Sequence, residues 1–130
     1  MALFTGMDIN ASGMSAQRLR MDVISENIAN VDTPGYKRQD VSFESVLSAA
    51  VAKGSSLSNN LTKTVRDINY NHVKPTVYTD NAELSYRIDG NNVDIDVEQI
   101  ELASNQLYYE AVTDSMKMEF DRFKAALSTK

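Results

Sequence analysis

The sequence has no cysteine, no tryptophan, one histidine and two prolines among its 130 residues. Without cysteine there can be no disulfide and no thiolate metal site. The single histidine, His72, has no serine or carboxylate at a spacing typical of a catalytic group. We therefore interpret His72 as a polar loop residue. We predict that the chain is not an enzyme and has no small-molecule substrate, cofactor or metal.

An excess of positive charge and a long apolar run are also missing. The formal net charge is −5, and the 13 basic residues are scattered, which argues against a nucleic-acid-binding protein. The longest apolar run, residues 46–52, is interrupted by Ser48 and falls far short of the ~20 residues that span a membrane. Arg18 is the first basic residue, so we expect no cleaved signal peptide. By themselves these features predict a cytosolic protein.

Residues 8–31 have the pattern of a helix with a broad apolar surface. A second apolar row, Ala16, Leu19 and Val23, runs beside the main one. A helix that is apolar over so much of its circumference needs more than one neighbour. The main seam follows a seven-residue spacing and contains Met7, Met14, Met21, Ile24, Ile28 and Val31.

The absence of glycine and proline from residues 93–130 predicts that this segment forms a second, longer helix. Asp96 is the predicted N-cap, and Gln99 completes a capping box. At 1.5 Å per residue the helix is ~50 Å long, which is more than a compact chain of this size requires. Two apolar stripes follow each other along it: first Val93, Val97, Ile100, Leu107 and Ala111, then Tyr109, Val112, Met116, Phe120, Phe123 and Leu127.

The centre of the chain predicts a small irregular module. We divide the chain into residues 1–31, an N-terminal helix; 32–92, the central module; and 93–130, a C-terminal helix. The expected pieces of the module are a helix over 41–52, a flexible link over 53–60, a strand over 61–65, an edge strand or loop over 70–80, and a hairpin around Asp89-Gly90 within 86–95.

The stretch Asn-Ile-Ala-Asn-Val-Asp-Thr-Pro-Gly-Tyr-Lys, residues 27–37, is the most informative motif. Pro34-Gly35 suits the centre of a type II turn, because proline presets φ and glycine accepts a positive φ. Asn27 and Asn30 either satisfy the last carbonyls of the helix or reach a neighbouring chain. The motif contains no nucleophile with a base, so it predicts a structural joint.

This motif, placed after the helix that begins Ser-Ala-Gln-Arg-Leu-Arg, resembles the N-terminal signature of bacterial flagellar axial proteins. The chain length and residues 86–98 resemble the proximal-rod members of that family. The resemblance implies that the two terminal helices pair as an antiparallel coiled coil, so that the fold is mainly α with a small irregular and β-hairpin centre. It also implies assembly into a helical tube, export without a cleaved signal, and a place in the basal body within the cell envelope.

The resemblance further implies partners: copies of the chain, other rod proteins, the rod adaptor and the base of the export gate. Two alternatives stay open. One is a different rod or hook-type protein, and the other is an acidic module that binds a divalent cation through Asp89, Asn91, Asp94 and Asp96. We expect subunit contacts at Met7, Met14, Met21, Ile24, Asn27, Ile28, Asn30, Val31, Asp32, Thr33, Pro34, Gly35, Tyr36, Lys37, Ile100, Leu107, Tyr109, Val112, Met116, Phe120, Phe123 and Leu127.

Overall fold

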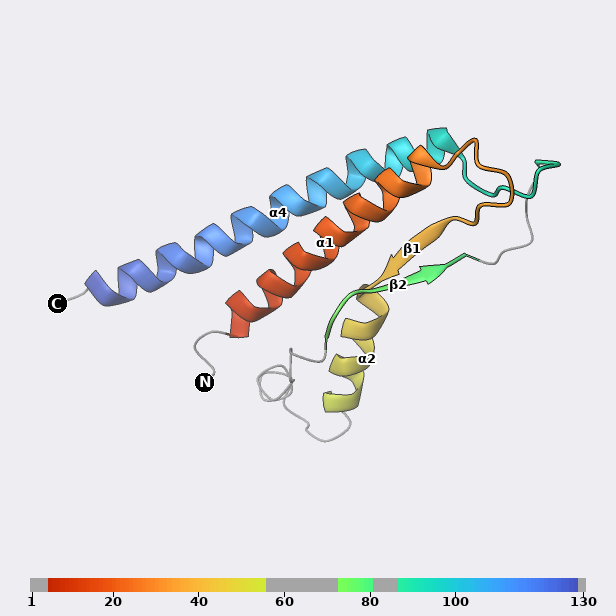
Figure 1. Ribbon diagram of the computed structural model, residues 1–130. Coiled ribbons are helices and arrows are strands. Elements are labelled where there is room, and N and C mark those ends of the chain that lie inside the picture. Colours follow the sequence, from red (N-terminus) through yellow and green to blue (C-terminus); the bar gives the residue numbers. More distant parts are fainter. Residues whose placement is uncertain (1–4, 56–72, 81–86, 129–130) are drawn as a thin grey trace.

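The computed structural model describes residues 5–55, 73–80 and 87–128 (Figure 1). This part of the chain is mainly helical, which confirms the predicted fold class: two long terminal helices and a small centre that contains two paired strands. None of its helices combines the length and the apolar content that crossing a membrane requires. The elements, in chain order, are α1 (Thr5–Ala29), β1 (Gln39–Ser42), α2 (Glu44–Ser55), β2 (Thr76–Thr79) and α4 (Ile95–Ser128).

The helices α1 and α4 lie side by side and run in opposite directions (Figure 1). A Cβ atom added at Gly6 would lie 3.3 Å from the side chain of Glu119, and one added at Gly13 would lie 3.6 Å from that of Val112. Position 6 therefore faces a later residue of α4 than position 13 does. This register confirms the predicted antiparallel pairing of the terminal helices.

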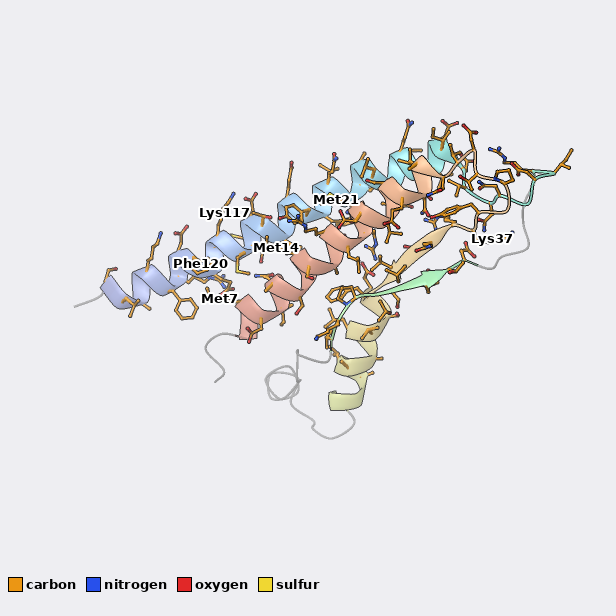
Figure 2. The ribbon with its side chains drawn as sticks, in the orientation of Figure 1. Met7, Met14, Met21, Lys37, Lys117 and Phe120 are labelled. Carbon is orange, nitrogen blue, oxygen red and sulfur yellow. The ribbon has the colours of Figure 1, made fainter. Side chains whose placement is uncertain are left out.

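The helix α4 is longer than its partner, with 34 residues against 25 in α1. Since Gly6 lies beside Glu119 near the start of α1, the last turns of α4 extend past the described part of α1 (Figure 1). Lys117 and Phe120 are close to this projecting end, while Met7, Met14 and Met21 follow one another along α1 (Figure 2).

The small sheet consists of β1 and β2, which pair antiparallel with Gln39 opposite Thr79 and Ser42 opposite Thr76. The predicted hairpin within 86–95 is wrong, because residues 87–94 contain no strand and Ile95 already belongs to α4. The physical reason is that side chains, rather than a second strand, hold the backbone of this segment. A tight turn at Gly90 remains, with a φ of +76°.

The predicted helix over 41–52 is shifted. Val41 belongs to β1, and α2 begins at Glu44 and continues to Ser55, into the predicted flexible link. Val41 is buried in the sheet and its carbonyl oxygen accepts a hydrogen bond from Arg20, so long-range contacts override the local helical pattern. The predicted strand over 61–65, the rest of the link and His72 lie outside the described residues.

The apolar core connects α1, the start of α2 and the chain before β2. Ala16 of α1, Phe43 and Val73 are all buried and form one cluster. Val46, Leu47 and Ala50 pack against this cluster from α2. Burial of these side chains joins the start of α2 to α1, while the rest of α2 leads away from the two long helices (Figure 1).

The start of α4 differs from the sequence prediction by two residues. Asp94, not Asp96, is the N-cap, because Asp94 Oδ1 accepts hydrogen bonds from the backbone N–H groups of Asp96 at 2.9 Å and Val97 at 3.3 Å. Asp96 lies within the first turn of the helix. Both aspartates suit a helix start, and the preceding backbone decides between them.

Candidate assembly site

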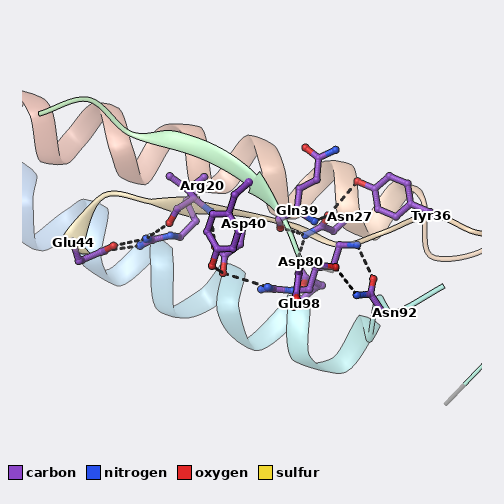
Figure 3. A network of polar contacts seen from close by, with 12 residues as sticks. Arg20, Asn27, Tyr36, Gln39, Asp40, Glu44, Asp80, Asn92 and Glu98 are labelled. Carbon is purple, nitrogen blue, oxygen red and sulfur yellow. Dashed lines mark hydrogen bonds and ion pairs between the residues drawn. The ribbon is translucent and has the colours of Figure 1, made fainter. Parts of the chain in front are cut away.

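The end of α1, the turn that follows it, β1 and the start of α4 meet in one polar region, which we call the junction (Figure 3). Its side chains connect segments that are distant in the sequence. This region contains the motif of residues 27–37, so it is where the predicted joint can be compared with the structure. The side chains that define the junction are Asn27, Arg38, Asn91, Asn92 and Glu98.

The turn at Pro34-Gly35 has the predicted geometry. The backbone N–H of Tyr36 donates to the carbonyl oxygen of Thr33 at 3.2 Å, and Gly35 has a φ of +74°. A positive φ after proline is what a type II turn requires, so the prediction is confirmed. The N–H of Gly35 also donates to the carbonyl oxygen of Asp89 at 2.9 Å, which attaches the turn to the segment before α4.

Asn27 is fully buried and makes four hydrogen bonds (Figure 3). Its Nδ2 donates to the carbonyl oxygen of Gln39 at 2.8 Å and to Glu98 Oε2 at 3.0 Å. Its Oδ1 accepts from the N–H of Gln39 at 2.9 Å and from the hydroxyl of Tyr36 at 3.1 Å. Asn27 therefore joins α1, the turn, β1 and α4 within one chain. Asn30, by contrast, satisfies a helix carbonyl, that of Glu26, at 2.8 Å.

Asn91 holds the other side of the turn and is also fully buried. Its Nδ2 lies 3.0 Å from each of three backbone carbonyl oxygens, those of Asn30, Val31 and Thr33. Its Oδ1 accepts from the N–H of Val93 at 2.7 Å. One side chain thus ties the backbone that follows α1 to the segment before α4.

Glu98 and Arg38 form an ion pair inside the junction. Glu98 is fully buried, and its Oε1 accepts from Arg38 Nε at 2.6 Å. Burial by itself lowers the pKa of Arg38, but the hydrogen bond and charge of Glu98, together with Asp40, outweigh that effect and raise it. A buried carboxylate needs such a partner and further donors, and Asn27 supplies one.

The end of β2 is joined to the junction through Arg38 and Asn92 (Figure 3). The N–H of Asp80 donates to the carbonyl oxygen of Arg38 at 2.8 Å, and the N–H of Arg38 donates to Asn92 Oδ1 at 2.7 Å. Asn92 Nδ2 then donates to the carbonyl oxygen of Asp80 at 3.1 Å. Lys37 Nζ donates to the carbonyl oxygen of Gly90 at 2.8 Å, which adds a second connection to the same segment.

The residues considered for a cation site serve the fold. Arg87 pairs with Asp89 at 2.9 Å and lowers the pKa of that carboxyl group. Asn91 binds backbone carbonyls, and Asp94 caps α4. Within the described ranges, histidine, aspartate and glutamate side chains form no group of three that could hold a metal ion.

A groove lies beside the junction, between the sheet, α1 and α4, with a volume of about 780 Å³. Arg20 forms an ion pair across it with Glu44 at 2.7 Å (Figure 3). The hydrogen bond from Arg20 lowers the pKa of Glu44, and the same bond raises the pKa of Arg20. The groove is also lined by Tyr78, Glu101 and Tyr108, among others.

The predicted contact residues have different environments. Of the apolar ones on α4, Ile100 and Leu107 are each 67% exposed, Phe120 is 51% exposed and Leu127 is 85% exposed. Asp32, Thr33, Pro34 and Gly35 of the turn are exposed as well. Ile24 and Asn27 are buried, and the half-buried ones are Met7, Met14, Met21, Ile28, Asn30, Val31, Tyr36, Lys37, Tyr109, Val112, Met116 and Phe123.

Sequence reasoning missed Glu98 and Asn105, which are buried against α1. Asn105 Nδ2 donates to the carbonyl oxygen of Gln17 at 2.8 Å. Both residues belong to a heptad seam of α4 that faces α1, and this spacing was the signal that would have revealed them. The seam combines Glu98, Asn105, Val112 and Glu119 with the half-buried apolar residues Leu102, Tyr109, Met116 and Phe123, each set spaced by seven.

Comparisons with known proteins identify the family of the chain. A family model described as flagella basal body rod protein matches residues 7–37. The flagellar basal body rod protein FlgB of Bacillus subtilis (strain 168) is 34% identical over 132 residues, and the match covers 98% of each chain. The protein of the same name from Borreliella burgdorferi is 36% identical over 115 residues, 83% of this chain and 84% of that one. FlgB of Escherichia coli (strain K12) is 37% identical over 98 residues, 70% of each chain. The chain therefore belongs to the flagellar basal body rod proteins, and among them to the FlgB family.

Proposed function

We propose that this chain, a structural subunit of the proximal flagellar rod, assembles through its terminal helices into a helical tube. The tube contains copies of the chain and other rod proteins, and motility requires it. The rod adaptor and the base of the export gate are the further partners we propose. In the same proposal the chain leaves the cytoplasm through the flagellar export apparatus, without a cleaved signal peptide, and acts in the periplasmic part of the basal body.

The exposed apolar side of α4 is the observation that carries this proposal. Ile100 and Leu107 lie on α4 and are each two-thirds exposed, while α1 covers another face of the same helix. Apolar side chains that gather along one exposed helix face indicate a surface for protein contacts. Contacts between different surfaces of identical subunits produce an open helical polymer when they do not close into a ring.

Substitution of this face tests the proposal. The double variant Ile100→Ser and Leu107→Ser should fold, because neither side chain contributes to the buried core. In a strain that lacks its own copy, we expect the variant to be produced and helical by circular dichroism but to give no rods by electron microscopy and no swimming. The matched control, Gln106→Ser, changes an exposed residue on a different face of the same helix and should swim normally. Normal rods in the double variant would contradict the proposal.

A further inference from the structure

The groove beside the junction is lined by more acidic than basic side chains, with Asp40, Glu44 and Glu101 against Arg20 and Arg38. Both of its arginines are engaged, Arg20 with Glu44 and Arg38 with Glu98 and Asp40. Glu101, which also lines the groove and is exposed, has no cation within ion-pair distance in the described part of the chain. The groove therefore favours a positively charged occupant.

The groove also has a polar atom that lacks a partner. Asn105 lines the groove and is 2% exposed, and its Oδ1 has no hydrogen-bond partner among the residues that the structure describes. A buried acceptor without a donor destabilises the chain, so a rearrangement of the groove that supplies a donor would be favourable. Tyr78 and Tyr108 add exposed aromatic surface to the same groove. A fitting occupant combines a cation and a hydrogen-bond donor with an apolar side chain.

The far end of α4 has this chemistry. We call residues 117–128 the distal tip. All three basic residues of α4, Lys117, Arg122 and Lys124, lie within it. Each pairs with an acidic residue three positions earlier. Asp114 and Asp121 are exposed and Glu119 is half-buried, but all three basic side chains are largely exposed, and such surface pairs exchange readily for new partners. Leu127, on the same tip, is 85% exposed.

Building on the proposed rod function, we propose that the distal tip of one copy docks in the groove of a second copy. Arg122 or Lys124 pairs with Glu101, and Leu127 packs against the two tyrosines of the groove. The groove residues of α4 and the tip are ~20 residues apart on one straight helix, which separates them by ~30 Å. A copy cannot place its tip in its own groove, so the contact joins two copies through two different surfaces and can repeat from copy to copy along a polymer.

A photo-crosslinker in the groove identifies the occupant. Tyr108 is replaced by benzoylphenylalanine, which preserves an aromatic side chain, in a strain that lacks its own copy and assembles rods from the variant. After illumination of isolated basal bodies, we expect a product of two copies in which mass spectrometry maps the link from position 108 to residues 120–128. The control places the same crosslinker at Ala49, an exposed residue of α2, and should not link to the tip. A link to another protein, or no link at position 108, overturns the proposal.

A charge exchange tests the same contact without the crosslinker. Glu101→Lys should reduce swimming, and so should the double variant Arg122→Glu and Lys124→Glu. The combined variant should regain at least half of the lost swimming, because the opposite charges meet again. Equal swimming in all variants, or a combined variant no better than its parents, overturns the docking. If rods assemble although both docking tests fail, the docking proposal is wrong and the proposed rod function stands. If rods form normally in the double variant of Ile100 and Leu107, the proposed rod function is itself wrong.

Discussion

The two ends of α4 differ in what stabilises them. Its first turns carry Glu98, fully buried between Arg38 and Asn27, and follow a segment whose backbone is bound by Asn91. Its last turns extend past the described part of α1 and expose Leu127 and the ion pair of Lys124 with Asp121. The first end is ordered by its own chain. The second exposes apolar surface that the described part of the chain does not cover, so the helix is anchored at one end and exposed at the other.

This difference separates two roles of polar and apolar residues. In the junction, buried polar groups specify geometry, because each hydrogen bond accepts only a narrow range of directions. At the distal tip, apolar groups tolerate many arrangements and contribute free energy in rough proportion to the area they bury. The comparison predicts that substitutions in the junction change folding stability, whereas substitutions at the tip change assembly.

The largest effect is expected for Glu98→Ala. The change leaves Arg38 without its closest carboxylate and removes an acceptor for Asn27, and breaking a buried pair costs about 3–5 kcal/mol. Urea unfolding of the isolated chain, followed by circular dichroism, measures this loss. The control Glu101→Ala removes an exposed carboxylate of the same helix and should stay within about 0.5 kcal/mol of the parent. Similar losses in the two variants would remove the distinction between the junction and the exposed surface.

The next largest effect separates two asparagines of the motif. Asn27→Ala leaves the N–H and C=O groups of Gln39 without a partner, and we expect a loss of about 2–3 kcal/mol in the free energy of unfolding. Asn30→Ala removes only a half-buried side chain at the end of α1, and the expected loss is about 0.5 kcal/mol. Urea midpoints of the two variants, measured side by side, give the difference. An Asn30 variant as unstable as the Asn27 variant would contradict the central role of Asn27.

Two glycine substitutions should act in opposite directions. Gly35→Ala places a Cβ at a φ of +74°, which costs about 1–2 kcal/mol even though the position has free space around it. Gly13→Ala lies within α1, where its Cβ would make ordinary van der Waals contact with Val112 at 3.6 Å. Alanine is favoured over glycine in a helix, so we expect a gain of about 0.5–1 kcal/mol. Thermal unfolding monitored at the helix signal distinguishes the two signs.

The smallest effect concerns pH and the pair of Arg20 with Glu44. Arg20 lowers the pKa of Glu44, so this pair stabilises the folded chain above the ordinary glutamate pKa, and the stabilisation is lost as the pH falls through the lowered value. Because the Glu44 side chain is 61% exposed, we expect no more than about 0.5 kcal/mol. The stability of the parent and of Glu44→Gln, measured between pH 7 and pH 3, should differ at neutral pH and converge in acid. A constant difference would exclude this pair as the cause.

The sequence predicted those features that depend on local pattern. The seven-residue spacing of Met7, Met14 and Met21 predicted α1, and the absence of glycine and proline predicted α4. The Pro34-Gly35 turn followed from the φ preferences of two residue types. The antiparallel pairing of the helices was expected from the family resemblance, and the structure agrees.

The parts that the sequence did not predict depend on distant partners. The strand β1 at Val41 exists because α1 and β2 bind its backbone on both sides, which the local pattern does not show. The N-cap at Asp94 follows from the conformation that Asn91 imposes on the preceding backbone. The heptad spacing indicates that Glu98 faces α1, but it does not indicate that Arg38, 60 positions earlier, is the partner of its carboxylate.

The length of α4 gives the junction an influence far from its own position. Since α4 is fixed at the junction and extends ~50 Å from it, a tilt of about 5° at the junction displaces the far end of the helix by about 4 Å. A displacement of that size is comparable to the width of a side chain. Small adjustments around Asn27 and Glu98 would therefore be felt most strongly at the opposite end of the helix, where they would re-aim the exposed Leu127.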